Sequence, residues 1–174
     1  MFEPNPSPPV DDELRGVPYR ALRLPSVYHD ELRIVSAGCL AFLDITDALQ
    51  GAVADSGFSD GIAVVQSLHT TAAIVVNEAE PLLLEDLRAV LERLVPRHAH
   101  YRHDDFSIRT VNMTPDEQPN GFAHCRALAL PTSVTFGVRR SRISLGRWQR
   151  VFFVELDRRR ERTVAVTVLG ACGT

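Results

Sequence analysis

Three histidines carry most of the chemistry that this sequence offers. His69 opens the segment His-Thr-Thr, His103 lies in an acidic stretch, and His124 belongs to the segment Asn-Gly-Phe-Ala-His-Cys-Arg. A neutral imidazole beside a carboxylate is the usual basis of an acid–base site or a metal site. The three histidines follow no metal-binding spacing, so only folding can bring them together. We predict that they converge in one cleft, with Glu78 or Glu155 nearby.

Polar residues also interrupt the apolar pattern between residues 62 and 76. His69, Thr70 and Thr71 are predicted to lie in mid-strand, and Asn77 and Glu78 at the junction between that strand and a helix. Buried polar groups need partners, and strand ends can present side chains to a ligand. In the ordinary alternative, the threonines are plain strand residues and Asn77 only turns the chain. The stretch by itself favours neither interpretation.

The basic residues of the chain are all arginines. The sequence has 19 of them and no lysine, which excludes Schiff-base chemistry on a lysine. Arginine forks or backbone amides must therefore hold any anion, and we expect Arg126 and Arg147 to give the cleft a positive potential for a phosphate. A net charge of −3 argues against general nucleic-acid binding, which usually needs a basic face.

Several familiar signatures are absent from the sequence. It contains no Gly-rich phosphate loop, no dinucleotide fingerprint and no Gly-x-Ser-x-Gly nucleophile elbow. Its three cysteines are far apart and follow no zinc spacing, which is typical of free thiols in a reducing cytosol. No apolar run approaches the roughly 20 residues of a membrane span. We therefore expect a cytoplasmic protein without a membrane partner.

The predicted elements form one domain of the α+β class. Residues 1–18 are rich in proline and acidic residues and predict a disordered arm, which leaves residues 19–174 as the domain. Helices are predicted over residues 46–54, 81–95 and 122–130, and strands over 19–34, 62–76, 133–138, 143–145, 148–156 and 163–169. Such a pattern indicates a compact domain of antiparallel β-sheet hairpins with two or three helices.

Two details of these elements bear on the core. The helix that starts at Pro81 carries an apolar stripe of leucine and valine, which predicts a face buried in the core. Glu155 lies in the strand Val-Phe-Phe-Val-Glu-Leu, where alternation places it on the face opposite Val154 and Leu156. A carboxylate in such a strand is usually solvated.

The polar motifs together resemble those of a known family. In chain order the motifs are His69-Thr-Thr, Asn77-Glu78, Tyr101-x-His103-Asp104, Asn120-Gly-x-Ala-His124-x-Arg126, Leu145-Gly-x-Trp-Gln149, Glu155 and Gly170. This ordered set is similar to that of the YjbQ-type family, small proteins often described as secondary thiamine-phosphate synthases. The resemblance covers residues 19–170, nearly the whole chain apart from the arm.

The resemblance implies an α+β homotrimer that joins a pyrimidine diphosphate to a thiazole phosphate, giving thiamine phosphate and pyrophosphate. The expected partner is thus a small phosphorylated molecule. The resemblance and the residue chemistry together give three sets of candidate site residues. Catalytic roles fall to His69, Glu78 and His124. Ligand-binding roles fall to Thr70, Asn77, Arg126, Arg147, Trp148, Gln149 and Glu155. A divalent metal, Mg²⁺ or Zn²⁺, would be held by His69, His103 and His124.

The chain departs from the family pattern at three positions. Arg126 stands where many members have lysine, Ala79 replaces an asparagine, and Phe122 replaces a histidine found in members with a His-Ala-His segment. The last departure removes a potential metal ligand. Two other functions therefore stay open beside the synthase: a small-ligand-binding trimer without turnover, and a metal-dependent hydrolase of phosphorylated metabolites.

Overall fold

The computed structural model describes residues 26–172, so the predicted arm 1–18 lies outside the described residues. The elements in chain order are β1 (Ser26–Val35), β2 (Ala41–Asp44), α1 (Thr46–Asp55), β3 (Phe58–Ser67), β4 (Ala72–Glu78), α2 (Pro81–Leu94), the 3₁₀ turn η2 (Arg102–Asp104), α3 (Gly121–Leu128), β5 (Ser133–Arg139), β6 (Arg142–Ile143), β7 (Gln149–Glu155) and β8 (Glu161–Cys172).

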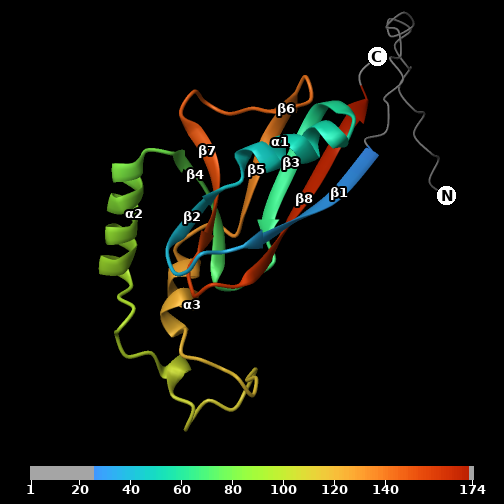
Figure 1. The fold of residues 1–174 in the computed structure, drawn as a ribbon. Coiled ribbons are helices and arrows are strands. Elements are labelled where there is room, and N and C mark those ends of the chain that lie inside the picture. The colour runs from blue at the N-terminus through green and yellow to red at the C-terminus, as the bar shows by residue number, and fades with distance from the viewer. Residues whose placement is uncertain (1–25, 173–174) are drawn as a thin grey trace, which may run out of the picture.

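The strands form two antiparallel sheets (Figure 1). The larger sheet has the order β1-β8-β3-β5-β6, and the smaller one has the order β2-β7-β4. This arrangement confirms the predicted α+β domain of antiparallel hairpins. The sequence pattern did not predict the short strand β2, which pairs with β7 from Ala41↔Glu155 to Asp44↔Phe152.

Strand β8 shows why the larger sheet forms. Val164, Val166 and Val168 are fully buried, while the residues between them are only partly buried. The period of two places the β-branched valines on the face that packs against α1 and the smaller sheet. Strand β8 pairs with β1 on one side and with β3 on the other, which makes it a central strand of its sheet.

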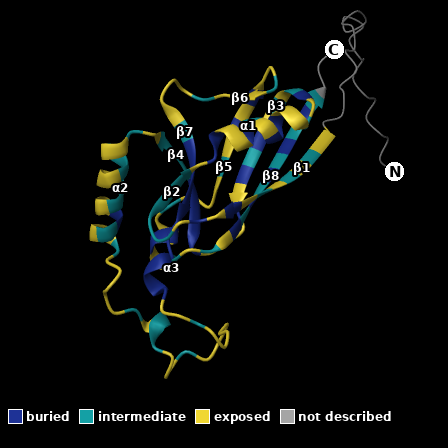
Figure 2. Ribbon diagram, in the orientation of Figure 1, coloured by how far each residue is buried: buried dark blue, intermediate teal, exposed yellow. Residues whose placement is uncertain are grey.

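Strand β7 is buried on both faces, unlike β8. Val151 and Phe153 belong to the core between the two sheets, whereas Phe152 and Val154 belong to a second core under α3. Figure 2 shows β7 and α3 as the most continuously buried part of the fold. The expectation that Glu155 is solvated is therefore wrong, because the face that alternation assigns to it is covered as well.

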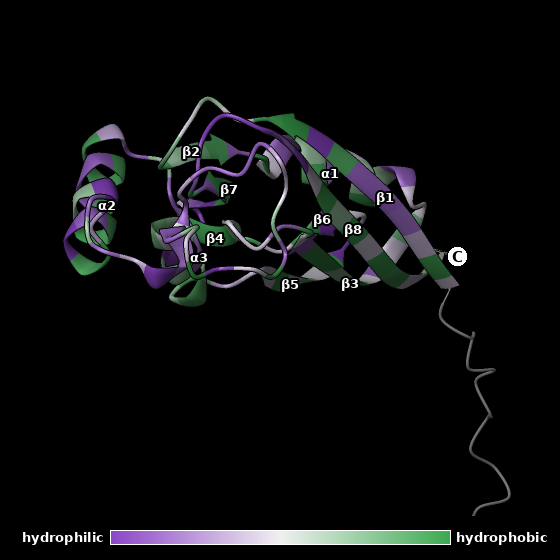
Figure 3. Ribbon diagram, turned by 90° about the horizontal axis from the view of Figure 1, so that it is seen from below, coloured by the Kyte–Doolittle hydropathy of each residue, from purple (hydrophilic) through white to green (hydrophobic). Residues whose placement is uncertain are grey.

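Helix α2 packs less closely than its sequence predicts. Its first turn is capped by Glu80, whose carboxylate accepts hydrogen bonds from the N–H groups of Leu82 and Leu83. The predicted core stripe is wrong, because Leu91 alone is buried in this helix and Leu94 is 67% exposed. Seen from below, α2 stands to one side of the two sheets (Figure 3). A groove of about 380 Å³ with apolar walls separates it from β4 and the end of α3.

Two short connections cross between the sheets at the same end of the molecule. Residues 68–71 join β3 of the larger sheet to β4 of the smaller one, and residues 156–160 join β7 back to β8. His69, Thr70 and Thr71 therefore lie in a turn, and the predicted mid-strand placement is wrong. Because Ala72 pairs with Glu155, and Ser67 with Val164, the two crossings are neighbours. This juxtaposition creates the site described below.

Candidate functional site

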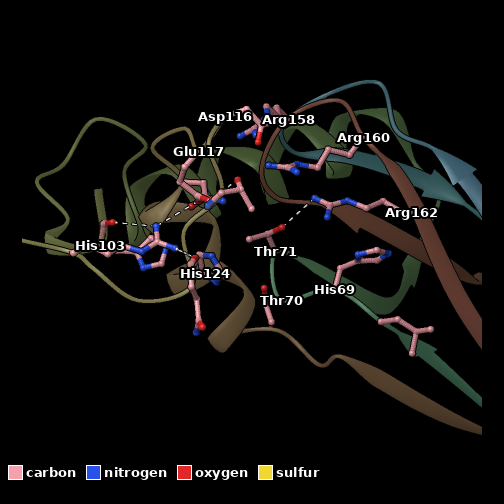
Figure 4. Close-up of a pocket in the computed structure, with 15 residues that line it drawn as sticks. His69, Thr70, Thr71, His103, Asp116, Glu117, His124, Arg158, Arg160 and Arg162 are labelled. Atoms are coloured by element: carbon pink, nitrogen blue, oxygen red, sulfur yellow. Dashed lines mark hydrogen bonds and ion pairs between the residues drawn. The ribbon is translucent and has the colours of Figure 1, made fainter. Parts of the chain in front are cut away.

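A cleft of about 690 Å³ opens between the two crossings, the loop before α3 and α3 itself (Figure 4). Its walls carry histidines, arginines, acids and hydroxyls, together with the apolar side chain of Leu68. The lining residues are Leu68, His69, Thr70, Thr71, His103, Arg109, Asn112, Thr114, Asp116, Glu117, Asn120, His124, Arg158, Arg160 and Arg162. The structure thus brings the three predicted histidines and Thr70 to one cleft.

His103 and His124 lie against each other, with ring centroids 4.6 Å apart. Asp104 fixes this contact, because its Oδ1 accepts hydrogen bonds from the N–H groups of Asn120 (2.9 Å) and Gly121 (2.8 Å) at the start of α3. Gly121 permits the close approach, since a Cβ there would lie 2.6 Å from the Cβ of Tyr101. The pKa of His124 is lowered, chiefly by burial and then by the neighbouring His103.

His69 has a structural partner within the cleft. Its Nε2 accepts a hydrogen bond from the backbone N–H of Thr163 at 2.8 Å, so that nitrogen carries no proton. Burial lowers the pKa of His69, and the nearby Arg162 lowers it further. Nε2 of His69 is therefore already engaged and is not free to exchange a proton with a ligand.

We expect the free energy of unfolding to fall as the pH is lowered from about 7.5 to 5. His69 and His124 both have folded pKa values below the usual 6.5, so the unfolded chain binds protons that the folded chain refuses. The carboxylates with lowered pKa values titrate below this window. In urea unfolding at several pH values, the free energy of unfolding of His69→Gln is expected to fall less over this range than that of the unaltered protein. His100→Gln, in an exposed loop, is the matched control, and an equal fall in all three proteins would contradict the assignment.

The floor of the cleft is a buried ion pair between Arg162 and Glu155. The Nε and Nη2 atoms of Arg162 donate to the two carboxylate oxygens of Glu155 at 2.7 and 2.6 Å. Arg162 Nη2 also donates to the hydroxyl of Thr71 at 3.0 Å, and the hydroxyl of Ser36 donates to Glu155 at 2.9 Å. The backbone N–H of Asp157 completes the set at 3.0 Å. Such full pairing allows both charges to stay buried.

The rim of the cleft carries two arginines that share one carboxylate. Arg158 and Arg160 both pair with the buried carboxylate of Asp157, at 3.3 and 3.0 Å. Two guanidinium groups thus share one carboxylate, and the exposed carboxylate of Asp116 lines the same cleft. Arg109, by contrast, has its own partner in Glu117 at 3.4 Å. Arg158 and Arg160 keep N–H donors that Asp157 does not use, and these can hold a phosphate or carboxylate.

The three histidines do not form a ready metal site in this structure. Within residues 26–172, no group of three or more histidine, cysteine, aspartate or glutamate side chains is arranged to hold a metal ion. His103 and His124 are close enough to act as two ligands, but the Nε2 lone pair of His69 is taken by Thr163. The predicted three-histidine set therefore does not fit a metal.

Arg126 lies away from the cleft, contrary to the expectation that it contributes to its positive potential. Its side chain is fully buried, donates to the carbonyl oxygen of Val95 at 3.0 Å, and pairs with Glu92. Phe122 is also buried, in the core between α3 and β7. The replacement of a histidine by Phe122 therefore removes no ligand from the cleft. Arg126 and Phe122 hold α3 in place.

Five other predicted site residues gather at the opposite end of the smaller sheet. Asn77 pairs with Arg150 and Glu78 with Gln149, so this end lies about 20 Å along β4 from the cleft, at a strand rise of about 3.3 Å per residue. Their contacts are local: Gln149 accepts a hydrogen bond from Gly146, and Arg147 stacks on Trp148. Within one chain, Asn77, Glu78, Arg147, Trp148 and Gln149 are therefore not part of the cleft.

Sequence reasoning missed the arginines of the cleft and Asn120. Taken alone, the run Asp157-Arg-Arg-Arg-Glu161 has the composition of a charged hairpin turn and gives no sign of a site. Its signal lay in its position directly after Glu155, because a turn at the end of a site strand presents its cations beside that site. The pairing of Asp157 with two arginines was visible only in the structure.

The fold and cleft define an α+β protein of two antiparallel sheets with a polar cleft at their crossings. The family model described as UPF0047 protein YjbQ-like matches residues 30–171, and the chain belongs to this family. A UPF0047 protein of Methanothermobacter thermautotrophicus is 37% identical over 144 residues, covering 83% of this chain and 93% of the relative. A UPF0047 protein of Archaeoglobus fulgidus is 37% identical over 139 residues, covering 80% and 99%.

Solved structures show the same fold. The crystal structure of a YbjQ-like protein of unknown function from Sulfolobus solfataricus P2 has a TM-score of 0.72 and 33% identity, and the match covers 84% of this chain and 99% of that chain. A hypothetical protein from Aeropyrum pernix K1 has a TM-score of 0.72 and 32% identity, covering 83% and 99%. In the part of the chain that the structure describes, no helix combines the length and apolar character that crossing a membrane requires.

Proposed function

We propose that this chain is a cytoplasmic enzyme that binds a phosphorylated small heterocycle in the cleft, with a reaction of the secondary thiamine-phosphate synthase type. The observation that carries the proposal is the pairing of Arg158 and Arg160 with the single carboxylate of Asp157, which leaves cationic donors at the mouth of the cleft. The free thiols of Cys39 and Cys125 suit a reducing compartment.

The proposed reaction makes one bond and breaks another. The ring nitrogen of the thiazole phosphate bonds to the methylene carbon of the pyrimidine diphosphate, and the bond from that carbon to the diphosphate oxygen breaks. The electron pair leaves with pyrophosphate, whose growing negative charge needs stabilisation. Arg158 and Arg160 can provide it through N–H donors fixed in place by Asp157. This step releases no proton, so His124, which is neutral at pH 7 because its pKa is lowered, can instead accept a hydrogen bond from the amino group of the pyrimidine.

Removal of the rim arginines is the direct test. We expect Arg158→Gln and Arg160→Gln each to lower kcat/KM for thiamine phosphate formation by roughly 10- to 100-fold, because each removes a donor to the leaving group. The assay measures thiamine phosphate and pyrophosphate from the two phosphorylated precursors. Arg159→Gln is the matched control, since Arg159 lies in the same turn but is exposed outside the cleft. It should retain the activity of the unaltered protein.

Growth rescue of a strain that lacks its main thiamine-phosphate synthase tests the same proposal in cells. Rescue by the unaltered chain and by Arg159→Gln, but not by Arg158→Gln, would support the synthase. Release of inorganic phosphate from a single precursor would instead indicate the hydrolase, and binding of precursors without any product would indicate the binding trimer. Either result would replace the synthase proposal.

We also propose that the chain assembles as a homotrimer, as the family resemblance implies. The supporting observation is the groove beside α2, where Phe42, Val75, Val90 and Leu94 present apolar walls to solvent in a single chain. Burial of this surface by a second copy would give α2 the packing it lacks, since Leu91 alone of its residues is buried. Light scattering at micromolar concentration should give three times the chain mass of 19.3 kDa, and a single-chain mass would reject the proposal.

A further inference from the structure

Two buried polar atoms of the cleft have no hydrogen-bond partner among the described residues. They are Nε2 of His103 and Oδ1 of Asn120. Asn120 is 5% exposed, and both residues line the same cleft. A buried polar atom without a partner costs stability, so native proteins usually satisfy such atoms with a ligand, an ion or water. The pair therefore marks a place for a polar group that residues 26–172 do not provide.

The side chain of Asn120 has no structural task that would explain its burial. It stands directly before α3, where asparagine often caps a helix, but it makes no capping hydrogen bond. Asp104 performs that task instead, through the backbone N–H groups of Asn120 and Gly121. The amide oxygen of Asn120 is thus left for a partner from outside the described part of the chain.

We infer that the His103–Asn120 end of the cleft binds a neutral hydroxyl or amino group of a ligand whose phosphate lies at Arg158 and Arg160. The phosphate end rests on the proposed function, and the other end rests on the two unpartnered atoms. A hydroxyl or amino group donates a hydrogen to Oδ1 of Asn120, which an anionic oxygen cannot do. If Nε2 of His103 carries a hydrogen, the hydroxyl oxygen of the ligand can accept it. If Nε2 carries no hydrogen, an amino group of the ligand can donate its second hydrogen to it.

The geometry of the cleft suits such a two-ended ligand. Figure 4 shows His103 and His124 on one side and Arg158 and Arg160 on another, and these pairs come from different segments of the chain. A volume of about 690 Å³ is in the usual range for sites that hold whole small molecules rather than single ions. The ligand class is therefore a phosphate ester that carries a hydroxyl or amino group at its far end.

Matched pairs of simple phosphate esters test the inference by calorimetric titration of the full chain. One series is ethyl, butyl and hexyl phosphate, and the other is the monophosphates of ethanediol, butanediol and hexanediol. At the chain length that spans the cleft, we expect the hydroxylated ester to bind about three- to tenfold more tightly than its alkyl partner. Asn120→Leu should reduce this difference, because it removes one of the two groups that contact the hydroxyl and leaves His103 as the other.

The possible results separate the two proposals. Equal affinities within every pair would show that water alone satisfies the two atoms, which overturns the inference and leaves the phosphate end intact. The proposed function fails, and the inference fails with it, if neither series of esters binds. The same holds if the Arg158→Gln/Arg160→Gln double variant binds both series as tightly as the unaltered protein does. Without ligand, Asn120→Leu should unfold at the same or a higher urea concentration. A lower midpoint would reveal a structural partner of Asn120 and overturn the inference.

Discussion

Replacement of Glu155 by glutamine is expected to lower the free energy of unfolding by about 3–5 kcal/mol. Glutamine keeps the size of the side chain but removes its charge, which leaves the guanidinium of Arg162 buried without a counter-charge. Arg162 is 6% exposed and Glu155 is fully buried, so solvent does not compensate for the loss. Urea denaturation followed by circular dichroism measures the change.

The matched control for Glu155→Gln is Glu78→Gln. Glu78 lies on β4, the strand that pairs with β7, but it is exposed at the far end. Its replacement should change the free energy of unfolding by no more than about 0.5 kcal/mol. The double variant Glu155→Gln/Arg162→Met is expected to be more stable than Glu155→Gln alone, because it removes the unpaired charge. A double variant as unstable as the sum of its single changes would contradict the ion-pair explanation.

Gly61→Ala is expected to destabilise the fold by about 3 kcal/mol, the upper end of the usual range for overpacking. Gly61 on β3 pairs directly with Gly170 on β8. A Cβ at Gly61 would lie 2.1 Å from the carbonyl oxygen of Leu169 and 2.7 Å from the Cα of Gly170. Backbone atoms cannot rotate away as a side chain does, so the two central strands must separate. Thermal and urea unfolding measure the loss.

Gly51→Ala is expected to change the stability of the fold in the opposite direction. Gly51 lies in α1, and a Cβ there would meet no atom within 4 Å. Alanine favours a helix over glycine, so this change should stabilise the fold by about 0.5–1 kcal/mol. Equal effects of the two substitutions would show that the close approach at Gly61 does not limit the packing of β3 on β8.

The fold was predictable wherever one face of an element is buried and the other is solvated. The alternating valines of β8 are such a signal, whereas α2 was predictable from Pro81 as a helix start, and both elements formed close to the predicted residues. Strand β7 also formed at the predicted residues, but prediction failed for the burial of Glu155, because the strand is covered on both faces and alternation shows only which face a residue is on. It also failed for the stripe of α2, because periodicity shows that a face is apolar but not what covers it.

The candidate site was predictable in its histidines and not in its cations. His69, His103 and His124 line one cleft, as their lack of any local purpose suggested, whereas their chemical roles stay predictions. Arg126 and Arg158 look alike in the sequence, yet one is buried beside Val95 and the other faces the cleft. The direction of a long side chain depends on packing between distant segments, which local sequence does not encode.

The double burial of β7 gives the cleft two walls of very different firmness. Glu155 ends this strand and Asp157 follows it closely, and we expect a strand buried on both faces to open only when the whole domain unfolds. The arginines paired with these two carboxylates should therefore keep their positions during local fluctuations. His103 belongs to a long segment with few buried residues, tied down mainly through Asp104. We therefore expect the entry and exit of a ligand to depend on the segment that carries His103, while Arg158 and Arg160 keep a fixed position.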